Sequence, residues 1–353
     1  MRILHASHTH MKSLGARNYF LPVRINNGFI RNGHEVFWFS DRDMARYAAP
    51  FNSRRFGVGA ANKKFLQVCR NFQPDVIALC SQDILQPETL LEARKILPNV
   101  AIFQYYIDPL FIEHNLRGAR AKAEVLDWTF VTTGGSVLRK VAGKASRVAF
   151  IPNPVDSSID VHKCHEQDDL EYDVFFAGGV SKNVDFEGLR VKAPELISDR
   201  LPETRCGFFG HSGFPSLFGA DFMDALGKAK IGLNFSRSIP GTASGEGGGL
   251  YLYSSDRIGL YMGNGMLVFS EKQFSLGELY GEGIVEVDGE DEFVEKLGYY
   301  LENDAERRRL AKLGYELAHE EFNECLVAQY MLERVMQEPL THDYRWPVDS
   351  FSA

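Results

Sequence analysis

The sequence predicts an α/β protein built from two doubly wound parallel sheets. Short apolar strand patterns alternate with helical patterns over residues 1–155, and a second such series begins at residue 172. This alternation is typical of parallel sheets that carry helices on both faces. A chain of 353 residues is too long for one ordinary core, so two domains are expected.

The first series contains five strand patterns separated by helices. The strands are expected within residues 2–7, 31–40, 72–80, 99–109 and 127–133. Residues 16–32 repeat apolar side chains with a helical period, and residues 87–96 form another expected helix. Two prolines around Asn153 then make a stiff, extended exit, which sets the first domain at residues 1–155.

The second series follows a polar linker and ends in helices. Its strands are expected within residues 172–180, 205–213, 229–237, 265–271 and 283–288, and its last helices at 291–303, 304–320 and 326–337. Residues 156–339 are therefore assigned to a second domain and residues 340–353 to a tail. Tyr344, Trp346 and Phe351 are expected to pin this tail to a domain surface.

Composition favours a cytoplasmic, globular protein. Hydrophobic residues make up 44% of the chain, yet no apolar run approaches the length of a membrane-spanning helix. The N-terminus lacks the apolar core and cleavage site of a signal peptide. The five cysteines are odd in number and widely scattered, which indicates reduced thiols rather than a disulfide framework.

Charge is unevenly distributed along the chain. The whole chain has a net charge of −8, whereas residues 1–72 hold 12 Lys and Arg against 3 acidic residues. This asymmetry indicates an anionic partner for the first domain, such as nucleic acid, a phospholipid surface or a phosphorylated acceptor. A chance distribution of surface charge is the alternative.

Several segments resemble the GT-B glycosyltransferases, and the resemblance extends over essentially the whole chain. The segments are "IPNPVD" (151–156), "YDVFFAGG" (172–179), "CGFFGHSG" (206–213), "DALGKAKIGLNFSR" (224–237) and the long stretch from "SDRIGLYMGNGMLVFSE" to "AHEEF" (255–322). Their order is most similar to that of the group that includes spore-maturation-type proteins. The resemblance implies two Rossmann-like domains facing a cleft, with C-terminal helices packing back.

The same resemblance implies a metal-independent transferase that moves a sugar from a nucleotide-activated donor to an acceptor. The donor would bind the second domain and the acceptor the basic first domain. With the charge of residues 1–72, a glycan or lipid-linked acceptor of the surface polysaccharide or lipopolysaccharide type is expected. Peripheral contact of this stretch with an anionic membrane, at its inner face, is also expected.

The stretch "YSSDR" (253–257) is the first candidate donor site. Ser254, Ser255 and Asp256 are residues of the N-cap type, and a helix start offers free N–H groups to phosphate. Arg257 is suited to charge-assisted bonds with a diphosphate or a carboxylate, and Tyr253 to stacking on a base or sugar. The alternative is that Asp256 only caps the helix and Arg257 pairs with a surface acid.

Further donor-binding candidates follow the other strands of the second domain. Glycines after a strand let the backbone approach a phosphate, and cations neutralise the leaving diphosphate. The candidates are Gly178, Gly179, Lys182, Arg190, His211, Arg237 and Glu246. Plain turns and surface loops are the alternative for each. Glu246 lies in the glycine-rich segment 244–253, which is suited to a lid.

One departure from the family pattern leaves the chemistry open. The large retaining GT-B families carry two glutamates seven residues apart in the donor loop. Leu252 and Leu260 stand at the corresponding positions here, and Glu246 is a loose substitute. The stereochemical outcome, the sugar and the nucleotide therefore stay undetermined.

The first domain supplies the catalytic candidates. His8 and His10 follow the first strand, and Asp108 ends another strand, where a general base would meet an acceptor hydroxyl. Asp before Pro is also a common turn starter. The histidines at 5, 8 and 10 are too closely spaced for one tetrahedral metal site, and "HKCH" (162–165) lies in the linker, so no metal is expected.

Three other functions compete with a transferase. An epimerase of the same fold would need several acids and bases around one sugar, and a degenerate module would bind a sugar nucleotide without catalysis. Nucleic-acid binding lacks an aromatic and basic platform, and the total charge is negative. Neither the sugar nor the oligomeric state follows from the sequence.

Overall fold

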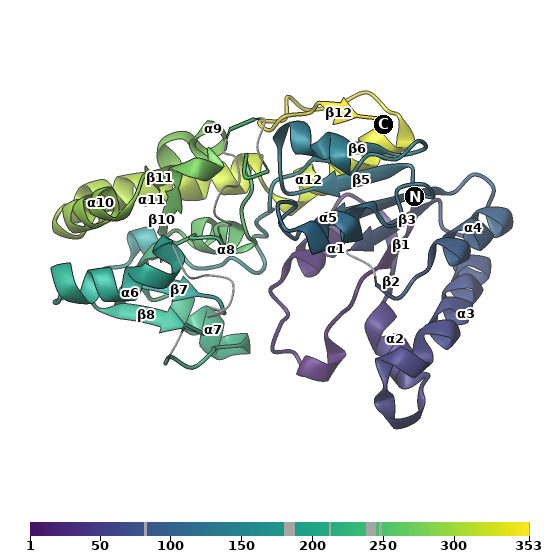
Figure 1. The fold of residues 1–353 in the computed structure, drawn as a ribbon, viewed down its shortest axis with the longest axis horizontal. Coiled ribbons are helices and arrows are strands. Elements are labelled where there is room, and N and C mark those ends of the chain that lie inside the picture. The colour runs from purple at the N-terminus through teal and green to yellow at the C-terminus, as the bar shows by residue number, and fades with distance from the viewer. Residues whose placement is uncertain (81–82, 180–187, 212, 238–244, 247–248, 353) are drawn as a thin grey trace. The chain divides into compact units, whose positions relative to one another are not determined.

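The computed structural model describes residues 1–80, 83–179, 188–211, 213–237, 245–246 and 249–352. The chain divides into two compact units, shown in Figure 1. Unit 1 comprises Met1–Thr132, Ser136–Pro152 and Glu324–Ala353, and unit 2 comprises Thr133–Gly135 and Asn153–Asn323. The prediction of two α/β units with parallel sheets is confirmed.

Unit 1 is built on a seven-stranded sheet with the order β12-β6-β5-β4-β3-β1-β2. Its strands are β1 (Arg2–Ala6), β2 (Glu35–Phe39), β3 (Val76–Cys80), β4 (Ala101–Tyr106), β5 (Trp128–Val131), β6 (Arg147–Phe150) and β12 (Ser350–Phe351). Ile3 lies between Val36 and Val76 in the central register. All pairs are parallel except β12 with β6, so a short antiparallel strand closes one edge.

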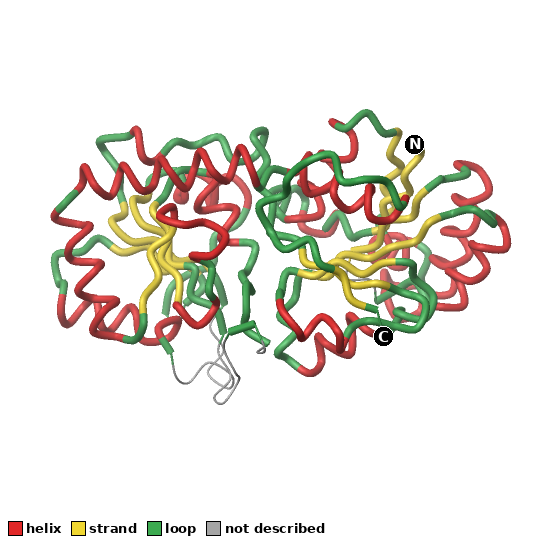
Figure 2. The backbone as a smooth tube through the Cα atoms, turned by 90° about the horizontal axis from the view of Figure 1, so that it is seen from above, coloured by secondary structure: helices red, strands yellow, loops and turns green. Residues whose placement is uncertain are grey.

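Helices cover both faces of this sheet (Figure 2). They are α1 (Leu21–Arg31), α2 (Asp41–Tyr47), α3 (Arg54–Phe72), α4 (Pro87–Ile96), α5 (Glu113–Arg120) and α12 (Glu324–Met336), with the 3-10 turns η1 (Met11–Ser13) and η2 (Pro50–Asn52). Apolar side chains such as Leu4, Phe65 and Ile77 are completely buried between α3, α4 and the sheet.

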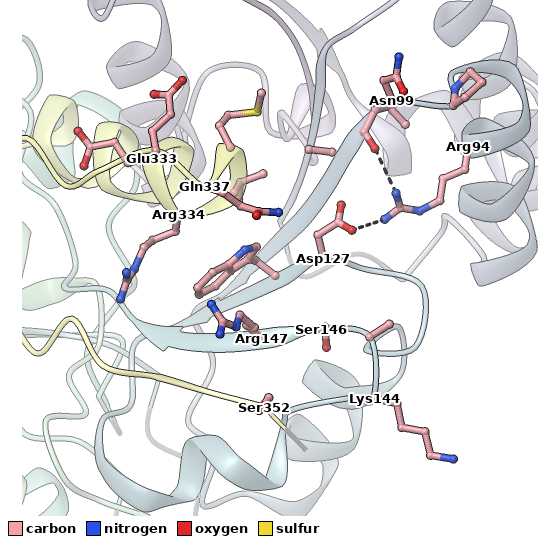
Figure 3. A pocket seen from close by; sticks show the side chains of 18 residues that line it. Arg94, Asn99, Asp127, Lys144, Ser146, Arg147, Glu333, Arg334, Gln337 and Ser352 are labelled. Carbon is pink, nitrogen blue, oxygen red and sulfur yellow. Dashed lines mark hydrogen bonds and ion pairs between the residues drawn. The ribbon is translucent and has the colours of Figure 1, made fainter.

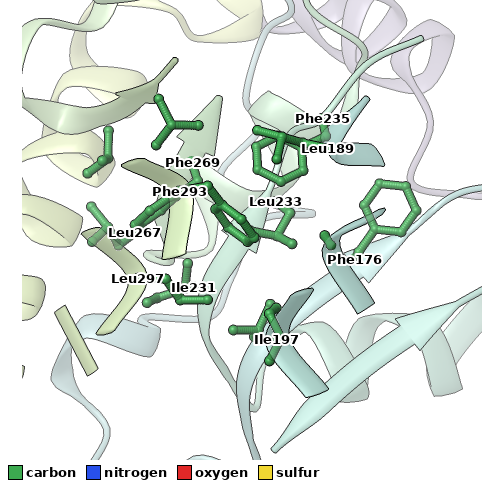
Figure 4. Close-up of a cluster of buried hydrophobic side chains, with 14 of the residues drawn as sticks. Phe176, Leu189, Ile197, Ile231, Leu233, Phe235, Leu267, Phe269, Phe293 and Leu297 are labelled. Carbon is green, nitrogen blue, oxygen red and sulfur yellow. The ribbon is translucent and has the colours of Figure 1, made fainter. Parts of the chain in front are cut away.

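Unit 2 carries a five-stranded parallel sheet with the order β11-β10-β9-β7-β8. Its strands are β7 (Tyr172–Ala177), β8 (Cys206–Phe209), β9 (Ala229–Leu233), β10 (Leu267–Glu271) and β11 (Ile284–Val287). The helices are α6 (Leu189–Arg200), α7 (Gly219–Leu226), α8 (Arg257–Gly263), α9 (Gly277–Tyr280), α10 (Glu290–Glu302) and α11 (Asp304–Glu321). The core in Figure 4 fills one face of this sheet with Ile231, Phe269, Leu297 and their neighbours.

The strand order of unit 2 fixes where a ligand site is expected. From β7 the chain passes outward to β8, and it then crosses back to place β9 on the other side of β7. Ligands of doubly wound sheets bind beyond the carboxyl ends of the strands at this reversal. In unit 2 that point lies after Ala177 and Leu233.

The assignment of residues 324–339 to the second domain is corrected by the structure. Helix α12 belongs to unit 1, where Arg31 pairs with Glu324 and the Asn32 side chain donates to the Cys325 carbonyl at 2.9 Å. A Cβ on Gly28 of α1 would lie 2.2 Å from the Glu324 carbonyl oxygen. Glycine at this position therefore lets α1 and α12 touch backbone to backbone.

The tail and the linker are both packed against a unit. The Tyr344 hydroxyl donates to Glu333 of α12 at 2.8 Å, and Trp346 is buried, so the expected anchoring of the tail is observed. The expected linker is part of unit 2. Asn264 accepts from the His162 backbone at 3.0 Å, and Cys164 is fully buried, because this segment packs on the turn after α8.

No helix within the described residues combines the length and the apolar character that crossing a membrane requires.

Candidate functional site

Two arginine side chains meet at the reversal point of the unit 2 sheet. The Arg257 guanidinium, at the start of α8, donates to the Phe235 carbonyl at 2.7 Å. Arg190, in the first turn of α6, donates to the same carbonyl at 3.2 Å and to the Gly179 carbonyl at 2.7 Å. The backbone segments that follow β7 and β9 therefore hold both cations in fixed positions.

Gly178 makes this close approach sterically possible. A Cβ at this position would lie 2.9 Å from Arg257 Nη1 and 3.3 Å from Arg190 Nη2. Both guanidinium groups also lie over the Phe176 ring, at 5.1 Å and 5.3 Å from its centroid. The end of β7 thus provides an aromatic ring, Phe176, beneath both guanidinium groups, and Gly178 after it provides a backbone position without a side chain.

Helix α8 is held on this edge by Tyr261. Its hydroxyl accepts from the Ala177 backbone N–H at 2.9 Å, and its ring covers Gly232 of β9, where a Cβ would lie 2.6 Å from the ring. The small residue in β9 therefore lets α8 sit close enough for Arg257 to reach the sheet edge.

Arg257 is buried without a carboxylate partner. Its exposure is 9%, it makes no ion pair with the residues that the structure describes, and its Nε has no hydrogen-bond partner there. A buried cation held only by carbonyl oxygens is costly unless an anion completes its environment. This arrangement is therefore suited to an anionic ligand.

Glu271 is a nearby acid that sequence reasoning missed. It ends β10 with 7% exposure, accepts from the Ser236 backbone N–H at 3.1 Å and accepts from Gln273 at 3.2 Å. Burial raises its pKa to about 7, although Arg257 and Arg190 oppose that rise. Near neutral pH this side chain is partly protonated, so it neutralises the two arginines incompletely.

The stretch 253–257 is organised differently from the predicted helix cap. Asp256 has α-helical backbone angles, φ −57° and ψ −16°, and its side chain makes no capping hydrogen bond. Asn153 donates to the Ser254 carbonyl and hydroxyl, both at 3.0 Å, and the Ser255 hydroxyl donates to Asn234 at 3.3 Å. Ser255 therefore ties this stretch to the end of β9 and Ser254 ties it to Asn153, and the capping alternative is wrong.

His211 joins the same edge from β8. It is 8% exposed, and its ring lies 6.3 Å from Phe176 and 5.9 Å from Phe208. Its Nε2 has no hydrogen-bond partner among the described residues. The structure thus brings Gly178, Arg190, His211 and Arg257 around the Phe176 ring, and the Gly179 carbonyl joins them through its hydrogen bond with Arg190.

The remaining donor candidates are spread more widely. Tyr253 is buried, with its ring 6.0 Å from Phe274, so its ring packs inside unit 2. Arg237 is half-buried beyond β9. Glu246 has its carbonyl close to Gly135, where a Cβ would approach within 2.3 Å. Lys182 lies outside the described residues.

The catalytic candidates of unit 1 lie after β1 and β4. The rings of His8 and His10 are 4.1 Å apart. Burial, with a smaller effect of Arg42, lowers the pKa of His8 to about 3, and burial with Arg17 lowers that of His10 to about 4. Both are therefore neutral at pH 7 and weak proton acceptors. Asp108 is exposed beyond β4.

His5 is a core histidine with both ring nitrogens satisfied. They lie 3.0 Å from Asn26 Oδ1 and 2.7 Å from the Tyr105 hydroxyl. Within the described part of the chain, no three His, Cys, Asp or Glu side chains are grouped to hold a metal ion. The expectation that no metal is needed stays a prediction.

A polar groove of about 910 Å³ lies at the end of the unit 1 sheet opposite to the one that carries His8, His10 and Asp108 (Figure 3). Arg94 and Asp127 pair across it at 2.9 Å, and Arg147 and Arg334 lie beside Trp128. These residues surround the amino-terminal ends of β4, β5 and β6. Sites in doubly wound sheets form at the carboxyl ends, so the groove is not the predicted acceptor site.

Comparison with known proteins finds one family model that matches part of the chain and many solved structures with a similar fold. Residues 193–333 match the family described as "Glycosyl transferase-like". A search among curated proteins finds no match. Sucrose-phosphate synthase from Thermosynechococcus elongatus is 12% identical, with a TM-score of 0.59 over 96% of this chain and 99% of that one.

Two further solved structures contain bound nucleotide ligands. An Escherichia coli trehalose-6-phosphate protein bound with UDP-2-fluoro glucose is 11% identical, with a TM-score of 0.59 over 96% of this chain and 100% of that one. Anabaena HepE in complex with UDP and glucose is 16% identical, with a TM-score of 0.53 over the same shares. At these identities the likeness shows the GT-B fold. The spore-maturation comparison stays a prediction.

Proposed function

We propose that the chain is a glycosyltransferase with the GT-B fold and that it takes a sugar from a nucleotide donor whose phosphate binds Arg190 and Arg257. The observation that carries this proposal is the buried guanidinium of Arg257, held by the Phe235 carbonyl without a carboxylate partner among the described residues. The nucleotide ligands of HepE and of the E. coli protein also support a sugar-nucleotide donor.

The two arginines would act mainly on the leaving phosphate. Negative charge develops there as the glycosidic bond to the nucleotide breaks. Cations that are already fixed by carbonyl oxygens and by the Phe176 ring stabilise that charge without reorganising. Because the cations supply this stabilisation, we propose that the reaction proceeds without a metal ion.

The acceptor hydroxyl needs a proton acceptor, and Asp108 is the preferred candidate in unit 1. Its carboxyl group is exposed at a strand end, whereas the lowered pKa values of His8 and His10 make both imidazoles weak bases. The basic charge of residues 1–72 supports a glycan or lipid-linked acceptor that carries negative charge and lies at an anionic membrane.

Thermal unfolding with a panel of sugar nucleotides tests the donor site. UDP-, GDP-, dTDP-, ADP- and CMP-linked sugars would be added to wild type, Arg257→Ala and Arg190→Ala. A donor at about 100 times its Kd stabilises the fold by about 2.7 kcal/mol. We expect one nucleotide class to raise the Tm of wild type and neither variant to respond.

Arg200→Ala is the matched control. Arg200 lies on α6 like Arg190, but it is exposed and pairs with Asp291 at 2.7 Å. Its variant should respond to the donor as wild type does. An undiminished response in Arg257→Ala and Arg190→Ala would refute the site. Binding without any release of nucleotide, with or without acceptors, would instead favour the non-catalytic module.

A further inference from the structure

The turn between α2 and α3 displays aromatic side chains to solvent. Phe51 is 99% exposed, Tyr47 82% and Phe56 73%. Single exposed apolar residues are ordinary, but three aromatic rings on one short turn form a patch. We call residues 47–56 the aromatic tip.

The aromatic tip is mounted on a rigid hairpin. A Cβ on Gly57 of α3 would lie 1.7 Å from the Ala45 carbonyl oxygen of α2, so the two helices touch backbone to backbone. Phe51 has φ 58° and ψ 22°, a conformation that residues with a side chain rarely adopt. The fold therefore holds this ring outward instead of burying it.

Cations follow the aromatic rings along α3. Arg55, Lys63 and Lys64 are exposed and make no ion pair with the described residues. Lys63 and Lys64 come seven and eight residues after Phe56, so they lie on the same face of α3, about 11 Å further along its axis. The hairpin thus presents rings at its end and positive charge behind them.

A second loop extends the patch. Met11 is 66% exposed and Leu14 93%, and Lys12 lies between them. The Met11 backbone N–H donates to Asp43 of α2 at 3.2 Å, which ties this loop to the hairpin. In Figure 1 the purple loop and the turn between α2 and α3 project from the same side of unit 1.

We propose that the aromatic tip inserts into the surface of an anionic bilayer. Phe51 and Phe56 would enter the boundary between headgroups and acyl chains, while Arg55, Lys63 and Lys64 contact lipid phosphates. A second copy of this chain fits less well, because pairing two such tips would bring like charges together. The aromatic tip specifies how the membrane contact of the proposed function is made, so the biological purpose of the tip rests on that function. Binding of the tip to a bilayer does not require the donor site.

Vesicle binding by the purified full chain tests the proposal. We expect binding to phosphatidylcholine vesicles that contain phosphatidylglycerol, and weak binding to pure phosphatidylcholine. Phe51→Ser/Phe56→Ser should weaken binding by about tenfold for each ring removed. Arg55→Glu/Lys63→Glu should weaken it by about fivefold for each charge, and salt should reduce that difference.

Matched controls distinguish vesicle binding by the aromatic tip from nonspecific binding of the protein to vesicles. Tyr299→Ser removes a ring of unit 2 that is 51% exposed, and Lys140→Glu/Lys144→Glu reverses two exposed cations of unit 1 outside the tip. Both controls should bind as wild type does. Thermal unfolding of every variant should match wild type, because the altered side chains are exposed.

Lipid with brominated acyl chains reports insertion directly. Tryptophan fluorescence of Phe51→Trp should be quenched on binding, and that of Tyr299→Trp should not. The proposal is overturned if wild type does not bind, if Phe51→Ser/Phe56→Ser binds equally well, or if the tip mediates self-association instead. The donor-dependent rise in Tm is measured in each variant, so failure of membrane binding and failure of the donor site are distinguishable.

Discussion

Both units present positive charge, but they place it in opposite environments. In unit 1, Arg55 of the aromatic tip and Lys63 and Lys64 behind it on α3 are exposed, solvated and adjustable. In unit 2, Arg190 and Arg257 are 8% and 9% exposed and are fixed to backbone carbonyls. The first arrangement suits a broad anionic surface and is weakened by salt. The second suits one phosphate in one position, because its geometry is set before the ligand arrives.

Removing Arg257 should have the largest effect of the changes considered. Arg257→Ala deletes a preorganised cation at the leaving phosphate, and such deletions lower kcat by about 10²–10³. Arg257→Lys should recover part of the loss, since it restores the charge without the two-pronged geometry. Measuring sugar transfer, or donor hydrolysis without acceptor, checks this. Equal activity of Arg257→Ala and wild type would remove the contrast between the two cation sets.

Glu271 of unit 2 predicts that the free energy of unfolding depends on pH. Its folded pKa of about 7 is above the ordinary value of 4.5, so the folded protein holds this proton more tightly than the unfolded chain does. The contribution is present at low pH and is lost as the pH rises through about 7. Relative to Glu271→Gln, wild type should lose about 2.5 kcal/mol of unfolding free energy between pH 5 and pH 8.

Urea unfolding at several pH values measures this difference. Glu271→Gln keeps an oxygen that accepts from the Ser236 backbone N–H, so it should fold and show a flatter profile. A wild-type profile as flat as that of the variant would show that Glu271 titrates normally.

Gly178→Ala should separate the donor site from global stability. The new Cβ would displace the guanidinium groups that now approach within 2.9 Å and 3.3 Å of its position, so donor affinity should fall by about tenfold. Gly179→Ala is the neighbouring control, because no atom of the described residues lies within 4 Å of its Cβ position. Calorimetric titration with the identified donor compares the two. Equal losses would mean that any change in this turn impairs binding.

The smallest effect is expected from the exposed cations. Arg55→Ala/Lys63→Ala should change the unfolding free energy by less than about 0.5 kcal/mol, as surface changes usually do. Donor affinity should also stay unchanged. Chemical unfolding and the same donor titration check both statements, and a large loss in either would show that unit 1 charge is structural.

The sequence indicated where the donor site begins, but not how it is built. Gly178, Arg190 and Arg257 were recognisable because each follows a strand or starts a helix. Glu271 was not recognisable, since a polar residue at the end of a strand usually marks the surface, and its burial depends on the segment after β9. The positions of Ser254 and Ser255 depend on hydrogen bonds with Asn153 and Asn234, which lie about 100 and 20 residues away along the chain.

Long-range packing also explains the errors in domain organisation. Helix α12 has an ordinary amphipathic pattern, and contacts with α1, such as that of Gly28 with the Glu324 carbonyl and that of Asn32 with Cys325, show which unit it joins. The polar linker was misjudged for a similar reason, because its buried groups are satisfied by the Asn264 turn of unit 2. Periodicity identifies elements, whereas such pairings become visible only in three dimensions.

The return of α12 to unit 1 has a consequence for biosynthesis. The main segment of unit 2, Asn153–Asn323, is continuous in the chain, whereas unit 1 needs Glu324–Ala353 to cover α1 and to close the edge at β6. During translation, domains fold as their residues emerge. The unit that is made first is therefore completed last, and the face of α1 on which α12 docks stays uncovered until α12 emerges from the ribosome.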